Sequence, residues 1–169
     1  MSAVIENHDH DHHGPQKGIL RWLFTTNHKD IGTLYLWFSF LMFLTGGAMA
    51  MGIRAELFEP GLQLMDPIRY NQLVTMHGLI MIFGAVMPAF VGLANWLIPM
   101  QIGAPDMALP RMNNLSFWLL PSAFIILLST AFMEGGLPGF GWTFYAPLST
   151  NYPNICLLYT SDAADDSLG

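Results

Sequence analysis

The chain has few charged residues. Asp, Glu, Lys and Arg together make up 11% of its 169 residues, less than half of the share that is usual in soluble domains. The six Lys and Arg are spread thinly and form no basic patch, which argues against nucleic acid as a partner. Hydrophobic residues make up 53% of the chain. Such a composition is typical of a protein whose surface faces lipid.

Cysteine is scarce, and a secretory signal peptide is not recognisable. Cys156 is the only cysteine, so an internal disulfide and a cysteine-based metal motif are excluded. Residues 1–18 (MSAVIENHDHDHHGPQKG) are polar and contain no apolar run of the kind that a signal peptide needs. The HDHDHH sequence within them could chelate a metal by composition alone. We interpret residues 1–18 instead as a disordered polar tail.

Three long stretches of the chain carry no Asp, Glu, Lys or Arg. They cover about residues 31–53, 71–100 and 112–133. As an α-helix the first would be roughly 34 Å long, enough to cross a hydrocarbon core of about 30 Å. Backbone in hydrocarbon must satisfy its own hydrogen bonds, so we expect helices rather than open strands. The sequence therefore predicts an all-α membrane protein, since a soluble fold would need three fully buried helices with almost no polar face.

The basic residues are distributed unevenly around these stretches. Three precede the first stretch and one lies in the 104–112 loop, whereas two lie in the 54–70 loop. Because Lys and Arg favour the cytoplasmic side, we expect the N-terminus and the 104–112 loop inside, and the 54–70 loop outside. The residues concerned are Lys17, Arg21, Lys29 and Arg111 on the inside, and Arg54 and Arg69 on the outside.

His77 is the only ionisable residue within the second stretch. Ionisable groups at membrane depth are paired, and they often mark a functional site. From its position alone His77 could ligate a haem, act as a hydrogen-bonded structural histidine or bind another metal. Gly78 and Gly84 would let a flat macrocycle approach the helix, and Pro88 predicts a kink because it cannot donate a hydrogen bond to Gly84.

Asp106 lies in the loop between the second and third stretches, close in sequence to three asparagines. Asn95 follows His77 by five α-helical turns, so an unbroken α-helix would place both on one face. Asn113 and Asn114 open the third stretch at the expected depth of Asn95. An acid beside amides at a membrane surface could admit protons or water. It could equally be a solvated loop with helix-capping asparagines.

Five consecutive blocks of the sequence resemble a known family. They are RWLFTTNHKDIGTLYLWF, IRAELFEPG, TMHGLIMIFGAVMP, NWLIPMQIGAPDMALPRMNNLSFWLLP and GWTFYAPLS. In this order they are similar to the beginning of subunit I of the haem–copper respiratory oxidases of the cytochrome c oxidase type. The resemblance covers roughly residues 19–152. It implies that the three stretches are transmembrane helices of the larger subunit I bundle, and that 19–155 is its N-terminal part.

The resemblance assigns roles to residues at the outer end of the bundle. His77 matches the axial ligand of the family's low-spin haem, and Arg54 matches an arginine that hydrogen-bonds a substituent of that haem. A cationic donor there would raise the haem's potential. Trp142 matches a tryptophan near the haem propionates. A Ca²⁺ or Na⁺ site of the family, whose oxygen ligands suit such cations, is matched by Glu56, Gly61 and Gln63.

At the inner end, the resemblance favours the proton interpretation of the polar residues. Asp106 matches the acid at the mouth of the family's proton-uptake path. Asn95, Asn113 and Asn114 match amides that hold water just inside that mouth. The implied function is reduction of oxygen to water with electrons from cytochrome c, coupled to proton pumping.

The implied partners are the lipid bilayer, oxidase subunits II and III, cytochrome c and oxygen, in a bacterial inner membrane with a cytoplasmic N-terminus. The family's second low-spin haem ligand, second haem and copper ligands belong to later helices, so this chain should not be active alone. A quinol oxidase of the same superfamily is one alternative. A haem-free transport protein that uses Asp106 and the asparagines is another. A reduced-minus-oxidised spectrum of the full-length protein separates the transporter from the oxidases.

The last residues, 156–169, are predicted not to be oxidase protein. The resemblance stops near Tyr152, and CLLYTSDAADD (Cys156–Asp166) is similar to the conceptual translation of a transposase sequencing adapter. We expect this segment to have no defined fold and Cys156 to have no redox or metal role. Sequencing the source gene across residues 150–169 should reveal further hydrophobic spans with histidines. A gene that encodes CLLYTSDAADD and then a stop would refute this prediction.

Overall fold

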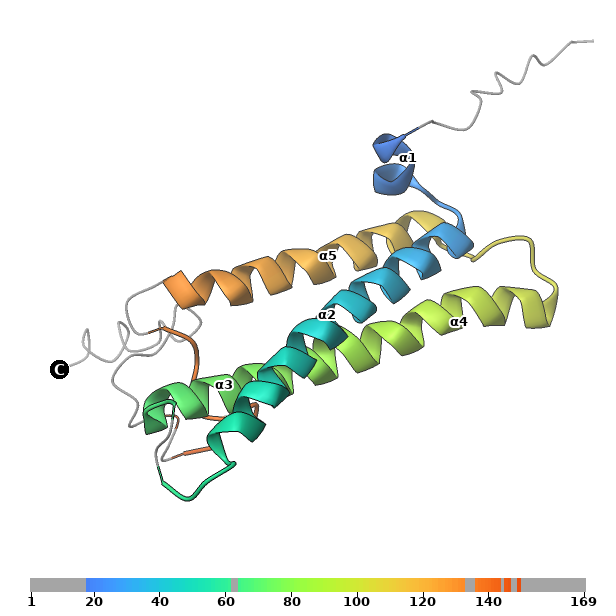
Figure 1. Ribbon diagram of the computed structural model, residues 1–169. Coiled ribbons are helices and arrows are strands. Elements are labelled where there is room, and N and C mark those ends of the chain that lie inside the picture. The colour runs from blue at the N-terminus through green and yellow to red at the C-terminus, as the bar shows by residue number, and fades with distance from the viewer. Residues whose placement is uncertain (1–17, 62–63, 133–135, 144, 147–148, 150–169) are drawn as a thin grey trace, which may run out of the picture.

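The regular elements of the described residues are all helices (Figure 1). The computed structural model describes residues 18–61, 64–132, 136–143, 145, 146 and 149. All of the predicted tail 1–18 except Gly18, and the whole segment 156–169, therefore lie outside the described residues. The elements are α1 (Ile19–Phe24), α2 (His28–Glu56), α3 (Pro67–Leu79), the π-helix η1 (Ile80–Val86), α4 (Met87–Ile102), α5 (Pro110–Ser129) and the 3₁₀-helix η2 (Thr130–Phe132).

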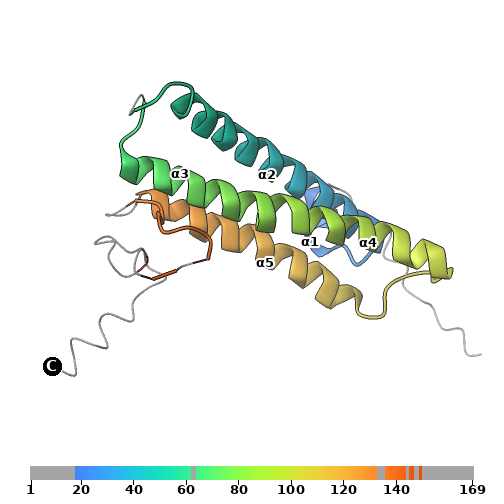
Figure 2. The same cartoon turned by 90° about the horizontal axis from the view of Figure 1, so that it is seen from below.

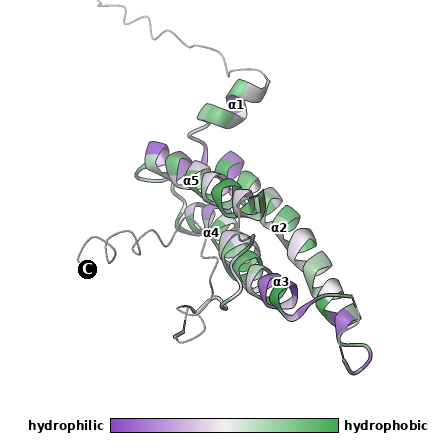
Figure 3. Cartoon of the chain, turned by 90° about the vertical axis from the view of Figure 1, so that its left-hand side faces the viewer, coloured by the Kyte–Doolittle hydropathy of each residue, from purple (hydrophilic) through white to green (hydrophobic). Residues whose placement is uncertain are grey.

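Three helical stretches are long and apolar enough to cross a membrane: His28–Glu56, Pro67–Ile102 and Pro110–Phe132. The predicted spans 31–53 and 71–100 fall inside the first two stretches, and the predicted span 112–133 coincides with the third as far as Phe132. The three stretches run side by side in both views (Figures 1 and 2). Hydrophobic residues cover their middle parts, and hydrophilic ones gather toward the ends (Figure 3). The prediction of an all-α membrane fold with three long apolar helices is therefore confirmed.

Local sequence explains where the helices begin and end. The Asn27 side chain accepts a hydrogen bond from Lys29 N at 2.9 Å and caps the start of α2. Pro67 and Pro110 occupy the first positions of α3 and α5, where a missing N–H costs nothing. Gly103, with φ of 67°, ends α4 in the left-handed conformation.

Helix α2 packs against α3, η1, α4 and α5 and is therefore the centre of the bundle. It crosses α4 at a pair of glycines. A Cβ on Gly32 would lie 2.9 Å from the Gly92 carbonyl oxygen, and a Cβ on Gly92 would lie 3.0 Å from the Gly32 carbonyl oxygen. Small residues at such a crossing let two membrane helices approach closely.

Aromatic rings fill the space between α2 and α5. Phe117 makes an edge-to-face contact with Tyr35 at 5.1 Å between ring centroids. Phe38 makes similar contacts with Phe117 and, at 5.6 Å, with Phe124. Phe38 therefore joins the two buried clusters of the bundle, one around Ile31, Tyr35 and Phe117 and the other around Met76, Ile80 and Phe124.

The second span is not one continuous α-helix, as the sequence led us to expect. The π-helix η1 begins three residues after His77, and its wider turns (bonds from residue i to i−5) break the α-helical periodicity between His77 and Asn95. The argument that they share a face by five α-helical turns is therefore wrong. The expectation for Gly84 is also wrong, because a Cβ there would lie 2.9 Å from Phe124 Cζ. Gly84 accommodates a neighbouring helix rather than a macrocycle.

The glycine crossing gives a testable prediction. Gly32→Ala should destabilise the protein by about 1–3 kcal/mol, because the new methyl group meets backbone that cannot move aside. Gly47→Ala is the matched control, since no described atom lies within 4 Å of its Cβ position. Thermal unfolding in detergent micelles should show a lower midpoint for Gly32→Ala alone. Equal midpoints for the two variants would contradict the close packing.

Candidate functional site

His77 lies on α3 with its ring half-buried against α2. Its Nδ1 is 2.9 Å from the carbonyl oxygen of Gly46. Since a carbonyl can only accept, Nδ1 carries the hydrogen, and in the neutral ring Nε2 keeps its lone pair. Metal-ligating histidines usually donate their other N–H in this way, which fixes the ring and strengthens the ligand. The geometry satisfies one ring nitrogen and leaves the other suited to a metal.

The chain after α5 returns to α3 (Figures 1 and 2). Gly141 N donates to the hydroxyl of the buried Thr75 at 3.0 Å. The Trp142 ring lies 6.5 Å from that of Phe83, and its Cδ1 is 4.0 Å from the position of a Cβ on Gly78. The structure thus places Trp142 beside the helical stretch that carries His77, between Gly78 and Phe83.

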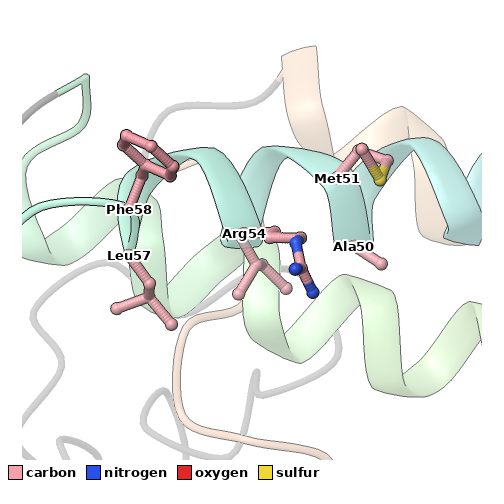
Figure 4. Close-up of a pocket in the computed structure, with 6 residues that line it drawn as sticks. Ala50, Met51, Arg54, Leu57 and Phe58 are labelled. Carbon is pink, nitrogen blue, oxygen red and sulfur yellow. The ribbon is translucent and has the colours of Figure 1, made fainter.

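Arg54 lies in the last turn of α2, beyond Gly46 on the same helix. It lines an open cavity of about 670 Å³ together with Ala50, Met51, Ile53, Leu57 and Phe58. Its side chain leaves the helix on the same side as Ala50 and Leu57 (Figure 4). The cavity is apolar except for the guanidinium, which therefore offers hydrogen-bond donors beside an apolar surface.

These residues fit a haem. His77 offers Nε2 as an axial ligand, and its other nitrogen is held by the Gly46 carbonyl. Outside the helix of Gly78, only Trp142 among the described residues comes within 4 Å of its Cβ position. Gly78 therefore leaves its part of the α3 surface, next to His77 in the sequence, without a side chain. Arg54 would hold a polar substituent and Trp142 would cover an edge.

At the opposite end of the bundle Asp106 pairs with His28, which the sequence analysis missed. Asp106 Oδ1 is 3.1 Å from His28 Nδ1, and the His28 side chain is 7% exposed against 42% for Asp106. The carboxylate accepts, so His28 Nδ1 donates. Nothing local in the sequence indicates this pair, since 78 residues separate its members. His28 Nε2 is buried and makes no hydrogen bond with any described residue.

Two of the three predicted asparagines meet next to this pair. Asn113 Nδ2 donates to Asn95 Oδ1 at 2.7 Å and lies 3.2 Å from the sulfur of Met107, whose backbone N–H is bound to Asp106 Oδ1. Asn95 Nδ2 donates to the Val91 carbonyl of its own helix. Met107 therefore contacts both sides, Asp106 through its backbone N–H and Asn113 through its sulfur, and Asn113 in turn binds the buried Asn95.

Asn114 points away from this line. Its Nδ2 donates to the Leu23 carbonyl at 2.9 Å, and Trp118 Nε1 donates to the same oxygen at 3.2 Å. Asn114 thus fixes the segment between α1 and α2. Its Oδ1 is buried and has no hydrogen bond within the described part of the chain. The structure does not bring Asn114 together with Asn95 and Asn113 through a direct contact.

Glu56, at the end of α2, closes the loop that follows it. Its carboxylate accepts hydrogen bonds from Leu64 N at 2.7 Å and Met65 N at 3.0 Å, and its side chain is buried. Gly61 is exposed and has φ of 108°, whereas Gln63 lies outside the described residues. No three His, Cys, Asp or Glu among the described residues are grouped so that they could hold a metal ion.

The chain is similar to subunits of respiratory oxidases. Residues 30–164 match the family described as Cytochrome C and Quinol oxidase polypeptide I. A Streptomyces avermitilis relative, provisionally named cytochrome c oxidase subunit 1-beta, is 48% identical over 136 residues, which are 80% of this chain and 24% of the relative. Cytochrome c oxidase subunit 1 of Corynebacterium diphtheriae is 46% identical over 138 residues, again 80% of this chain and 24% of the relative.

The chain spans about a quarter of the length of these relatives. The family match also includes residues 156–164, part of the segment that we attribute to a sequencing adapter. That attribution stays a prediction.

Proposed function

Because the chain belongs to the cytochrome c and quinol oxidase polypeptide I family, we propose that it forms part of the catalytic subunit of a terminal respiratory oxidase. The whole subunit would reduce oxygen to water with electrons from cytochrome c and pump protons. The orientation of His77, whose Nδ1 is held by Gly46 so that Nε2 can ligate, is the observation that carries the proposal. Relatives named cytochrome c oxidase subunit 1 support cytochrome c rather than quinol as the electron donor.

The residues around His77 would hold the low-spin haem. When bound, the haem would accept electrons one at a time and pass them on. His77 would hold the haem iron through Nε2, while the Gly46 carbonyl keeps its ring in place. Arg54 would donate hydrogen bonds to a substituent, and its positive charge would favour the reduced ring. Trp142 would exclude water from the propionate edge. The second axial ligand, the second haem and the copper would depend on residues outside this chain.

Replacing His77 with Ala in the full-length protein should abolish the low-spin haem signal in the reduced-minus-oxidised spectrum. His77→Met should retain a haem of altered potential, because a thioether replaces the imidazole. Asp106→Asn, at the other end of the bundle, serves as control and should leave the haem content normal. A His77→Ala protein with the low-spin signal intact would refute the assignment.

The opposite end of the bundle would admit protons. Asp106 is partly exposed and can exchange protons with water, and its partner His28 is buried behind it. The hydrogen bond from Asn113 to the buried Asn95 places two amide groups further inside the bundle, beyond Met107. Amide side chains both donate and accept, so they can order water without trapping charge. Asn114 would belong to the same water path through its free carbonyl oxygen, although it makes no direct contact with Asn95.

Asp106→Asn in the full-length protein should slow oxygen turnover and proton pumping strongly, because an amide cannot take up and release a proton near neutral pH. Asp66→Asn is the matched control, since Asp66 is an exposed acid that pairs with Arg69 at the other end of the bundle. Oxygen consumption and proton release by reconstituted vesicles measure both effects. Turnover of Asp106→Asn near the wild-type rate would identify Asp106 as an ordinary loop residue.

The Glu56 loop would bind Ca²⁺ or Na⁺ through Glu56, the Gly61 carbonyl and the Gln63 side chain. Glu56 is buried and already gathers the loop by accepting two backbone hydrogen bonds. A carboxylate oxygen can accept these bonds and still coordinate a hard cation. The cation would stiffen the loop rather than take part in proton uptake.

Glu56→Gln should lower the thermal midpoint and the bound Ca²⁺ measured by elemental analysis, and it should leave proton uptake unchanged. Glu59→Gln, on the same loop, is the control. A chelator should lower the wild-type midpoint toward that of Glu56→Gln. If chelation changes nothing and no bound Ca²⁺ or Na⁺ is found, Glu56 acts only as a cap for the loop backbone.

The membrane setting follows from the same proposal. The chain would lie in a bacterial inner membrane with its N-terminus and Asp106 on the cytoplasmic side, and with Arg54 and Glu56 outside. Its partners would be subunits II and III, cytochrome c and oxygen. A haem-free transport protein would also use Asp106 and the asparagines. In such a protein, however, the hydrogen bond that leaves His77 Nε2 available as a ligand would have no function.

A further inference from the structure

Ser39 lies buried in the middle of α2 and binds the π-helical segment that follows His77. Its Oγ donates to the carbonyl oxygen of Ala85 at 2.7 Å, and its side chain is 7% exposed. Other serine hydroxyls of the bundle, such as that of Ser122, donate to a carbonyl of their own helix. The Ser39 hydroxyl instead crosses from α2 to η1.

The π-helical segment needs such a contact at its end. Met87 N donates to the Ile82 carbonyl, five residues earlier, and the next residue is Pro88, which has no N–H. The series of π-helical hydrogen bonds therefore stops at Pro88, and α-helical hydrogen bonds follow in α4. The boundary between two helical forms can move along a chain when the backbone alone defines it, because each form satisfies most of the same groups. A side-chain bond at Ala85 fixes one position of that boundary.

The same face of α2 binds the last turn of η1 and, on α3 just before η1, His77. Ser39 binds the Ala85 carbonyl, and the Gly46 carbonyl accepts from His77 Nδ1. Between these bonds the helices are in close contact, since a Cβ on Gly46 would lie 2.5 Å from Met81 Sδ. Ser39 and Gly46 are seven residues apart, which is two turns of α2, so both lie on the same side of that helix.

We propose that Ser39 is a positioning residue for His77: it fixes the end of η1 and thereby the rotation of His77 against the Gly46 carbonyl. The inference rests on the proposed role of His77 as a haem ligand. Without the Ser39 hydroxyl, the boundary moves and the helix that carries His77 turns relative to α2. The Nδ1–H···O bond then lengthens, the imidazole donates less electron density to iron, and the haem potential rises.

The test uses the full-length oxidase and measures the low-spin haem directly. Ser39→Ala should raise the midpoint potential of the low-spin haem and move its electron paramagnetic resonance g-values. Ser39→Thr keeps the hydroxyl and should restore both toward wild type. Ser122→Ala removes an exposed hydroxyl that bonds only within its own helix, and it should change neither. A purely structural role would lower the thermal midpoint of Ser39→Ala without moving potential or g-values, and this outcome would overturn the proposal.

Additional variants distinguish a failure of Ser39→Ala to assemble, a failure of the proposed role of Ser39 and a failure of the proposed function. If Ser39→Ala does not assemble, Ser39→Cys, whose thiol is a weaker donor, should give a smaller shift in the same direction. A wild-type potential in Ser39→Cys then overturns the proposal. If His77→Ala retains the low-spin haem, the proposed function itself fails. If His77→Ala loses the haem and Ser39→Ala leaves its potential unchanged, only the role of Ser39 fails.

Discussion

A polar group inside a membrane bundle must find its hydrogen-bond partner within the protein, because hydrocarbon offers none. This constraint decides the arrangement of the helices. His77 is bound to the Gly46 carbonyl, Ser39 to the Ala85 carbonyl and Asn113 to Asn95. Each of these bonds joins two different helices, so each fixes how far one helix can slide or rotate against the other. Apolar packing alone would allow several registers of one helix against another. Lipid tails are as apolar as leucine side chains, so a helix face gains little from exchanging one for the other.

Helix α2 connects the two chemically distinct ends of the bundle. Its first residue, His28, binds Asp106 near one surface, and its Gly46 carbonyl orients His77 toward the other. The Gly32 and Gly92 crossing holds α2 tightly against α4 between these two points. One rigid helix therefore supplies a partner to the proposed proton entry and to the proposed haem ligand. Both contacts therefore come from one continuous helix, His28–Glu56.

The second span combines two requirements that an ordinary α-helix does not satisfy together. Its first part, α3, presents His77 to α2, and its last part, α4, presents Asn95 to Asn113. The π-helical segment between them changes the rotation of one part relative to the other. Pro88, which lacks an N–H, ends this segment, and Gly84 leaves room for Phe124 and Met42. The segment is therefore a defined feature of the span, and its position matters for both ends.

The sequence by itself determined the class of fold and the three long apolar helices, and it singled out most of the candidate site residues. Uncharged runs long enough to cross a bilayer have only one stable backbone solution, and an ionisable residue such as His77 stands out against them. The sequence could not determine that His28 binds Asp106, that Asn114 turns toward Leu23, or that η1 interrupts the second span. These features depend on which residues meet across helices. Periodicity describes one helix at a time, whereas a hydrogen bond between residues 78 positions apart exists only once the helices have packed.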